Sequence, residues 1–345
     1  MPQGSAPVIL MHPMAAVTIA LRYDLRSPEW AATPHAEMYR TCLEQCVWAD
    51  ETGAADIVSL SEHHGIDDGY LPAPFAMAAA IAGATKRLPI TIAAALVPLH
   101  DPVRLAEQIA VIDLASGGRV SFVAGTGYKR SEFEMAGVTY KERGRMLEEF
   151  IDVMRKAWTG EPFEWQGRMV TVRPTPVTKP HPLIMGGGSG PKAARRAARM
   201  RLPFFPGVGD PALKEAYEDE CRKVGFDQGF CVLPHGPGFV HVTEDPDKAW
   251  DQISRYAWYD ADTYRSWQEG TRAEVLTSAP DVDALRREGI YRVVTPDECV
   301  ALAEELSPGG AIVLHPLLCG MPADLGWESL HLFRDRVLPR IRPQD

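Results

Sequence analysis

Long hydrophobic runs are missing from this 345-residue sequence, and no run of about eighteen apolar residues occurs that could cross a membrane. Cysteine is also scarce, because the chain has six cysteines and no Cys-x-x-Cys pair. A chain of this length can bury a full core without disulfides, so the few cysteines indicate a reducing, cytoplasmic location. Residues 1–13 have no basic segment before their short apolar stretch, and we therefore expect no signal peptide.

An excess of positive charge is absent as well. The 36 lysines and arginines are outnumbered by 46 aspartates and glutamates, which gives a formal net charge of −10. Nucleic-acid binding depends on concentrated basic residues, so this balance argues against a nucleic-acid partner. Low-complexity tracts are also missing, and the 46% hydrophobic content is typical of a globular protein.

Short apolar runs instead alternate with helical patterns along the chain. Eight runs have strand character: 17–23, 56–61, 88–97, 119–124, 183–185, 204–205, 239–242 and 311–314. Parallel strands joined by helices produce this rhythm, and eight of them favour a single (β/α)8 barrel over residues 1–345. Residues 160–175 predict an inserted hairpin, and residues 244–300 predict a polar helical extension before the last strand.

Barrel enzymes carry their active sites after the carboxyl ends of the strands. His63 and His64 follow the second strand, and successive side chains of an extended chain point in opposite directions, so one histidine can face the barrel mouth. Histidine titrates near neutral pH and can act as a general acid or base. The alternative interpretation is that one histidine bonds the loop backbone and the other is solvated.

Small residues follow the third and fourth strands. Ala93 and Ala94 could leave room for a flat ligand, although from the residues alone close packing within the strand explains them better. The sequence Gly125-Thr126-Gly127-Tyr128 allows close backbone approach to a ligand. It is not a dinucleotide fingerprint, because Arg130 occupies the position of the third glycine.

A glycine-rich run precedes the basic helix predicted over 192–200. It reads Gly186-Gly187-Gly188-Ser189-Gly190, and it would place free N–H groups and the positive end of a helix dipole together. This pattern predicts a phosphate site, with an ordinary flexible loop as the alternative. The Gly-Lys-Ser/Thr ending of nucleoside triphosphatases is missing, which disfavours ATP hydrolysis.

Other catalytic patterns are not found. No Gly-x-Ser-x-Gly elbow supports a hydrolase, and Glu132 and Glu134 are interpreted as solvated loop carboxylates. His235, His241 and His315 are scattered, with no His-x-x-x-His spacing or carboxylate triad, so we expect no metal site.

Several spaced motifs together resemble the bacterial luciferase-like monooxygenases, which include FMN-dependent and F420-dependent enzymes. The resemblance lies in the stretches 56–64 (DIVSLSEHH), 91–105 (TIAAALVPLHDPVRL), 112–120 (IDLASGGRV), 125–144 (GTGYKRSEFEMAGVTYKERG), 182–189 (PLIMGGGS) and 315–339. It implies a barrel that binds a flavin-type cofactor at its mouth. It also implies a non-prolyl cis peptide at Ala93–Ala94, a catalytic role for His63 with His64 beside it, and a phosphate loop at Gly187, Gly188 and Ser189.

One residue departs from luciferase itself, because Thr126 stands where luciferase has an arginine that meets the flavin phosphate. We therefore expect the glycine-rich run to bind the phosphate, with Lys129 or Arg130 as further candidate ligands. The departure also disfavours light emission as the activity.

The resemblance implies an oxidoreductase that uses reduced FMN and O₂ to oxygenate a small organic substrate. Reduced flavin would come from a separate flavin reductase, because the chain has no NAD(P)H fingerprint, and a homodimer is expected. One alternative is an F420-dependent oxidoreductase that transfers hydride without O₂. An alternative of another class is a non-catalytic flavin-binding protein.

Overall fold

The computed structural model describes residues 17–268 and 277–342, and these residues form two compact units. Unit 1 contains residues 60–65 and 72–234, and unit 2 contains residues 17–59, 66–71 and 235–342. Residues 1–13, for which no signal peptide is expected, and residues 269–276 of the expected extension lie outside the described residues. No helix within the described ranges is long and apolar enough to cross a bilayer.

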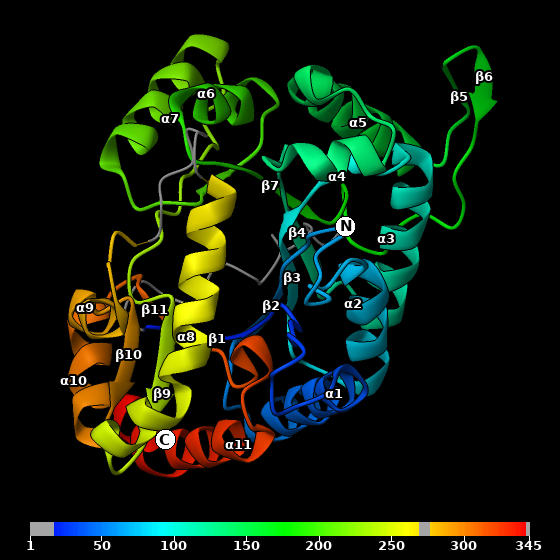
Figure 1. Ribbon diagram of the computed structural model, residues 1–345. Coiled ribbons are helices and arrows are strands. Elements are labelled where there is room, and N and C mark those ends of the chain that lie inside the picture. Colours follow the sequence, from blue (N-terminus) through cyan, green and yellow to red (C-terminus); the bar gives the residue numbers. More distant parts are fainter. Residues whose placement is uncertain (1–16, 269–276, 343–345) are drawn as a thin grey trace. The chain divides into compact units, whose positions relative to one another are not determined.

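Unit 1 is built from parallel strands covered by helices (Figure 1). Its strands are β3 (Ile90–Ala95), β4 (Val120–Ala124), β5 (Phe163–Trp165), β6 (Arg168–Val170), β7 (Leu183–Gly188) and β8 (Phe204–Pro206). Its helices are α2 (Pro74–Ala84), α3 (Pro102–Ser116), α4 (Arg130–Met135), α5 (Arg143–Ala157), α6 (Pro191–Arg199) and α7 (Pro211–Val224), with short 3₁₀ turns at Val97–Leu99 and Tyr140–Glu142.

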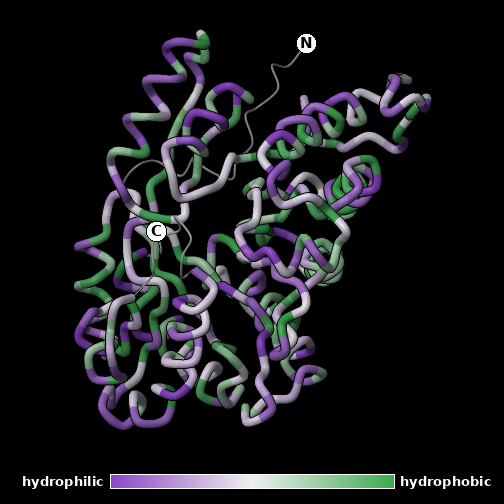
Figure 2. Tube along the Cα trace, turned by 45° about the horizontal axis from the view of Figure 1, so that its top comes forward, coloured by the Kyte–Doolittle hydropathy of each residue, from purple (hydrophilic) through white to green (hydrophobic). Residues whose placement is uncertain are grey.

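Strands β3, β4, β7 and β8 pair in parallel in that order. Their carboxyl ends therefore lie along one edge, where the sequence placed the candidate site. Helix α3 shows why these elements form: the Asp101 carboxylate caps the N–H groups of Val103 and Arg104, and Gly117 ends the helix with a φ of 67°. The helices alternate between hydrophilic and hydrophobic residues along the trace, as helices with one buried face do (Figure 2).

The predicted hairpin is present. Strands β5 and β6 pair antiparallel and extend beyond α5 (Figure 1). Gln166 and Gly167 connect them with φ values of 50° and 70°, which suits the twist of a two-residue hairpin loop.

Unit 2 has the same kind of architecture. Its strands are β1 (Thr18–Tyr23), β9 (Phe239–Val242), β10 (Tyr291–Val294) and β11 (Ala311–Leu314), and β2 (Ile57–Leu60) leads the chain into unit 1. Its helices are α1 (His35–Thr52), α8 (Pro246–Gln268), α9 (Val282–Glu288), α10 (Pro296–Leu306), α11 (Ala323–Leu332) and α12 (Leu338–Ile341), with a 3₁₀ turn at Leu318–Gly320 and a π-helical segment at Phe333–Val337.

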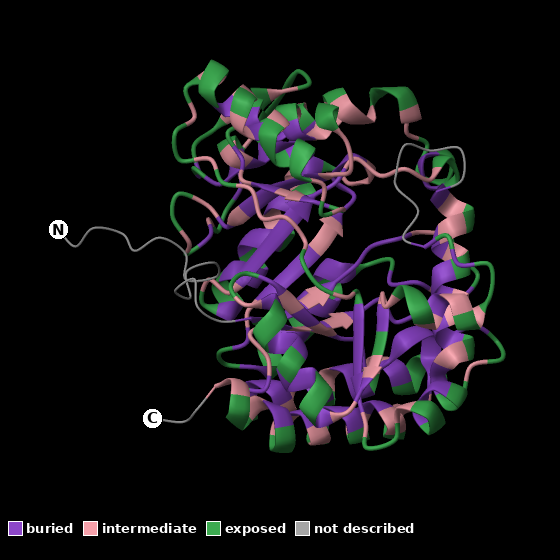
Figure 3. Cartoon of the chain, turned by 90° about the vertical axis from the view of Figure 1, so that its left-hand side faces the viewer, coloured by how far each residue is buried: buried purple, intermediate pink, exposed green. Residues whose placement is uncertain are grey.

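The strands of unit 2 pair in parallel in the order β10-β9-β11-β1. Most strand residues in both units are buried, whereas the helices expose their outer turns (Figure 3). Strand β10 was not predicted, since its four residues lie inside the segment interpreted as a helical extension. They add to the edge of β9, so residues 244–300 supply a strand as well as helices.

Candidate functional site

The candidate site is built on the carboxyl ends of the strands of unit 1. Residues 61–64 follow β2, residues 125–128 follow β4, and Ser189 and Gly190 follow β7. The backbone N–H of Leu96, directly after β3, donates to Glu62 Oε2 at 2.6 Å. This bond fixes the histidine-bearing segment to the end of β3.

His63 is held by a buried carboxylate. The imidazole is 5% exposed, and its Nδ1 lies 2.6 Å from Glu132 Oε1 on α4. The same oxygen accepts the backbone N–H of His64 at 3.0 Å. Glu132 itself is 1% exposed, so the expectation that it is a solvated loop residue was wrong. Glu132 lies on the buried face of the short helix α4, whereas Glu134 on the same helix is exposed.

The other imidazole nitrogen of His63 meets Tyr128. Tyr128 Oη lies 3.2 Å from His63 Nε2, and the two rings cross edge to face. A carboxylate can only accept, so the network assigns the proton to His63 Nδ1 and makes Nε2 the acceptor in the neutral ring. Tyr140 donates to the Tyr128 carbonyl at 3.2 Å, and Arg143 lies over the Tyr140 ring. The chain Glu132–His63–Tyr128 can therefore hold and transfer a proton at Nε2 or at the phenol.

His64 points to a different carboxylate. Its Nε2 lies 3.0 Å from Glu62 Oε1, and His100 Nε2 lies 2.6 Å from the same oxygen. Burial opposes ionisation of Glu62, but the bonds from His100, His64 and the Leu96 N–H hold its pKa at about 2. Burial also opposes the charged form of His64, yet the hydrogen bond and charge of Glu62 raise the pKa of the imidazole. The two histidines after β2 thus belong to separate clusters.

The Ala93–Ala94 peptide bond is cis, as the resemblance implies. The pairing of β3 with β4 shifts at the same place, so Ala94 is the extra residue of a bulge. Both alanines are partly exposed on a strand whose other residues are buried. A Cβ on Gly125 would lie 3.0 Å from the Ala94 Cβ, which is a tight contact, so glycine eases packing beside the bulge. This edge therefore carries only small residues, Ala93, Ala94 and Gly125.

The glycine-rich run is mostly strand and not loop. Gly186, Gly187 and Gly188 belong to β7, because they pair with β8, and only Ser189 and Gly190 lie between β7 and α6. Added Cβ atoms would lie 2.5 Å from Ala197 at Gly186, 2.7 Å from Val123 at Gly187 and 2.5 Å from Ala193 at Gly188. The three glycines thus allow close packing of α6 and β4 against β7.

The start of α6 retains the features of an anion site. Gly190 has extended backbone, no side chain caps the helix, and Pro191 occupies its first turn. Ser189 and Gly190 are partly exposed. A phosphate at this helix N-terminus would meet the Ser189 hydroxyl and the positive end of the dipole.

The remaining predicted residues lie after β4. Thr126, Gly127 and Tyr128 are partly exposed, and Gly127 has a φ of 71°. The Arg130 guanidinium lies 4.5 Å from the centre of the Tyr140 ring, so this candidate phosphate ligand is engaged with the loop that holds Tyr128.

Unit 2 contains a separate buried ionic cluster that sequence reasoning missed. Arg26 is fully buried, with Nε 2.7 Å from Asp68 Oδ2 and Nη1 2.8 Å from Asp260 Oδ1. Tyr259 and Trp267 place their rings over the guanidinium, at 5.0 and 5.3 Å. These partners come from segments far apart in the chain, so no local sequence motif predicts the cluster.

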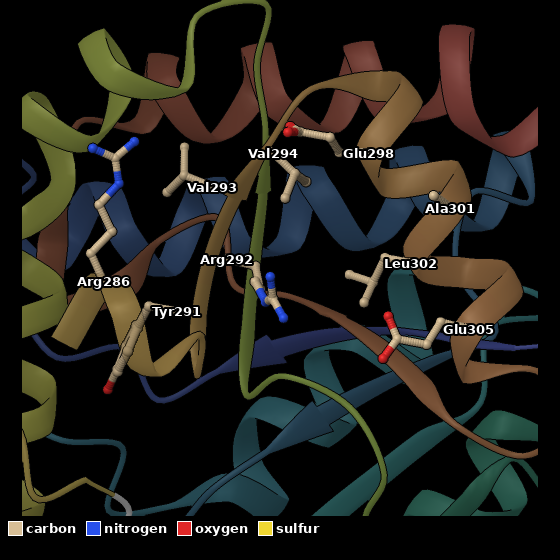
Figure 4. A pocket seen from close by; sticks show the side chains of 9 residues that line it. All are labelled: Arg286, Tyr291, Arg292, Val293, Val294, Glu298, Ala301, Leu302 and Glu305. Carbon is tan, nitrogen blue, oxygen red and sulfur yellow. The ribbon is translucent and has the colours of Figure 1, made fainter. Parts of the chain in front are cut away.

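A groove of about 320 Å³ also lies on unit 2, lined by residues of α9, β10 and α10 (Figure 4). Arg292, Glu298 and Glu305 stand around apolar Val293 and Leu302 in this view. None of its lining residues belongs to the candidate site, and a shallow groove with both charge signs specifies no ligand.

Comparisons with known proteins show which proteins the chain is similar to. The chain is 30% identical over 178 residues to an FMNH₂-dependent dimethylsulfone monooxygenase of Pseudomonas putida, covering 49% of each chain. The chain spans about half the length of the curated relatives it matches.

Solved structures match over nearly the whole chain. One is the FMN-bound oxygenating constituent of 3,6-diketocamphane monooxygenase of Pseudomonas putida, with a TM-score of 0.72, 20% identity and coverage of 94% of this chain and 98% of that one. Another is an F420-dependent secondary alcohol dehydrogenase with an F420–acetone adduct, with a TM-score of 0.64, 19% identity and coverage of 95% and 99%. These matches confirm the predicted fold class.

The model of one protein family extends across both units. It covers residues 25–310, which include each strand-end segment of the candidate site. The chain belongs to the luciferase-like monooxygenase family.

Proposed function

We propose that this protein is a monooxygenase that uses reduced FMN and O₂ to oxygenate a small organic substrate. The observation that carries the proposal is the family match together with 30% identity to an FMNH₂-dependent enzyme. Because the sequence has no NAD(P)H fingerprint, a separate flavin reductase would supply the reduced FMN. All six cysteines are free thiols, which supports a cytoplasmic location for this chemistry.

The residues on the strand ends fit such a cofactor. The isoalloxazine ring would lie against Ala93 and Ala94, where small side chains and Gly125 permit close contact. The phosphate would bind Ser189 and Gly190 at the start of α6, and Thr126 and Gly127 would line the space between. When bound, reduced flavin supplies the electrons that activate O₂.

His63 is the proposed acid–base residue. Glu132 fixes the proton on His63 Nδ1, which leaves Nε2 and the Tyr128 hydroxyl to exchange a proton at the site. Glu132 acts through His63 and is a positioning residue. His64, also predicted as catalytic, has its Nε2 on Glu62 and would act indirectly, by fixing the segment that carries His63.

An F420-dependent hydride-transfer enzyme is the second candidate. The match to an F420-dependent alcohol dehydrogenase over 95% of this chain favours it, because the same barrel accepts that cofactor in place of FMN. The two candidates differ in whether O₂ takes part, and this difference can be measured directly.

The deciding experiment is an anaerobic titration of the purified protein with reduced FMN and, separately, with F420. Binding of reduced FMN, followed by its oxidation and product formation when air and substrate candidates are admitted, supports the monooxygenase. Binding of F420 alone assigns the second candidate, and binding of neither cofactor contradicts both. Oxidation that yields only H₂O₂ with every substrate candidate points to the non-catalytic flavin-binding alternative.

A variant locates the phosphate. Ser189→Asp places a negative charge at the start of α6, and we expect it to weaken FMN binding at least tenfold while leaving riboflavin, which has no phosphate, unaffected. Ser266→Asp on the exposed side of α8 is the control and should leave both affinities unchanged. Equal losses for FMN and riboflavin would place the phosphate elsewhere.

A homodimer is also part of the proposal. Helix α1 buries Met38, Cys42 and Cys46 within unit 2, so these side chains are not available to a partner chain. Helix α2 instead exposes small residues, and its neighbour α3 exposes Val111 and Leu114, at 54% and 43%. An apolar face of this kind is suited to packing against a second copy of the chain.

A further inference from the structure

Three metal-ligating side chains converge beside the candidate site, in a place that sequence spacing did not reveal. Glu62 Oε1, His64 Nε2 and His100 Nε2 lie within 4.8 Å of one another. His100 follows the 3₁₀ turn after β3, whereas Glu62 and His64 follow β2. The fold brings these two segments together, so a motif search along the chain cannot find the cluster.

The cluster needs only a small rearrangement to reach the geometry of a metal site. Metal–ligand bonds of about 2.1 Å at tetrahedral angles separate the ligand atoms by about 3.4 Å. The present separations from Glu62 Oε1 are 3.0 Å to His64 and 2.6 Å to His100, so each imidazole would move outward by less than about 1 Å. Both imidazoles are partly exposed, at 18% and 22%, and can make this shift.

The Glu62 carboxylate is already oriented as a metal ligand would be. Glu62 is fully buried, and its Oε2 accepts the N–H of Leu96, which orients Oε1 toward the two histidines. A hydrogen-bonded second oxygen is the usual support of a metal-bound carboxylate. Two imidazoles and one carboxylate suit Zn²⁺ and similar ions, and they leave one coordination position open.

We propose that Glu62, His64 and His100 form a binding site for a divalent transition-metal ion, with Zn²⁺ as the best fit. The ion would tie the segment that carries His63 to the end of β3, which carries Ala93 and Ala94. His63 takes no part, because its Nδ1 is bound to Glu132. The ion would thus hold these two segments together, and the site is independent of which redox cofactor the protein uses.

The test is metal titration of the full-length, chelator-treated protein, with Zn²⁺ followed by calorimetry and Co²⁺ by visible absorption. We expect one equivalent to bind and His100→Gln to weaken the affinity at least about tenfold. His181→Gln is the matched control, because this partly buried histidine bonds the Pro182 carbonyl outside the cluster, and it should bind metal like the wild type. The Co²⁺ spectrum should lack thiolate charge-transfer bands, which separates the site from the six cysteines.

Clear outcomes would overturn the proposal. They are an absence of binding, a Co²⁺ spectrum with thiolate bands, and equal affinity in the wild type and His100→Gln. His64→Gln provides a second ligand variant if His100→Gln fails to fold, as judged by circular dichroism. If metal binding is unchanged in both His64→Gln and His100→Gln, the metal does not bind at this cluster. The cluster would then serve only to share protons through its hydrogen bonds.

Discussion

The orientation of His63 depends on one carboxylate, and this dependence can be tested by substitution. Glu132→Gln keeps the shape of the side chain but removes the carboxylate that holds His63 Nδ1. We expect reoxidation of bound reduced FMN, coupled to substrate oxygenation, to slow by about tenfold to hundredfold, with little change in FMN affinity. Stopped-flow spectroscopy measures both quantities.

Glu134 offers the matched control for this substitution. It lies on the same helix but is exposed, so Glu134→Gln should behave like the wild type. Equal rates for Glu132→Gln and the wild type would remove His63 and Glu132 from the proton transfer.

His241 predicts a pH dependence of stability. Burial lowers the pKa of this histidine on β9 from 6.5 to about 4, so the folded state keeps it neutral. The unfolded chain takes up its proton first as the pH falls, and the free energy of unfolding therefore decreases between pH 6.5 and 4, by about 3 kcal/mol from this residue. Well above pH 6.5 His241 is neutral in both the folded and the unfolded state, so it adds no pH dependence to the free energy of unfolding.

Urea unfolding at several pH values measures this slope. His241→Gln should lose less stability than the wild type between pH 6.5 and 4.5, whereas the exposed His235→Gln should follow the wild type. Parallel curves for all three proteins would show that His241 is not buried in its neutral form.

At the level of elements, the glycines of β7 serve packing. A Cβ on Gly186 would lie 2.5 Å from the Ala197 Cβ, so Gly186→Ala should destabilise the fold by about 1–3 kcal/mol. Combining it with Ala197→Gly removes the clash, and we expect the double variant to lose at least about 1 kcal/mol less than the sum of the single losses. Gly190→Ala, where a Cβ meets open space, is the control in denaturant unfolding.

The elements also show which parts of the fold the sequence encodes locally. Strand β9 was predicted at its observed bounds, because a run rich in valine and phenylalanine between a Gly-Pro-Gly turn and a polar segment is a local signal. Strand β10 was missed, since its short run YRVV lies in a polar segment and becomes a strand only by pairing with β9. The glycine run was assigned to a loop for a related reason, because the close approach of α6 is invisible in the sequence.

Prediction of the candidate site also depended on whether the signal was local in the sequence or came from contacts between distant segments. His63, Tyr128 and the alanines were proposed because they follow predicted strand ends and lie in stretches that resemble the family. Glu132, Glu62 and His100 were not assigned to the site, because their roles depend on contacts between segments that lie 34 to 69 residues apart. A carboxylate next to a recognised histidine motif, as Glu62 is, was the one available signal.

At the scale of the whole molecule, the proposed dimer gives a further prediction. Val111 and Leu114 are one turn apart on α3 and are both exposed, so they form an adjacent apolar pair that a partner chain could cover. Light scattering after size-exclusion chromatography should give about twice the chain mass of 38.0 kDa for the wild type.

Charge on this face should prevent the association. The double substitution Val111→Glu and Leu114→Glu would bury two uncompensated carboxylates in a dimer, so we expect the mass of a single chain across the micromolar range. Met169→Glu, on the exposed hairpin strand β6 and 70% exposed, is the control and should leave the dimer intact. A wild-type monomer at all concentrations contradicts the dimer. A dimer that tolerates both glutamates places the interface on another face. Val111 and Leu114 would then be available for the reductase that delivers reduced flavin.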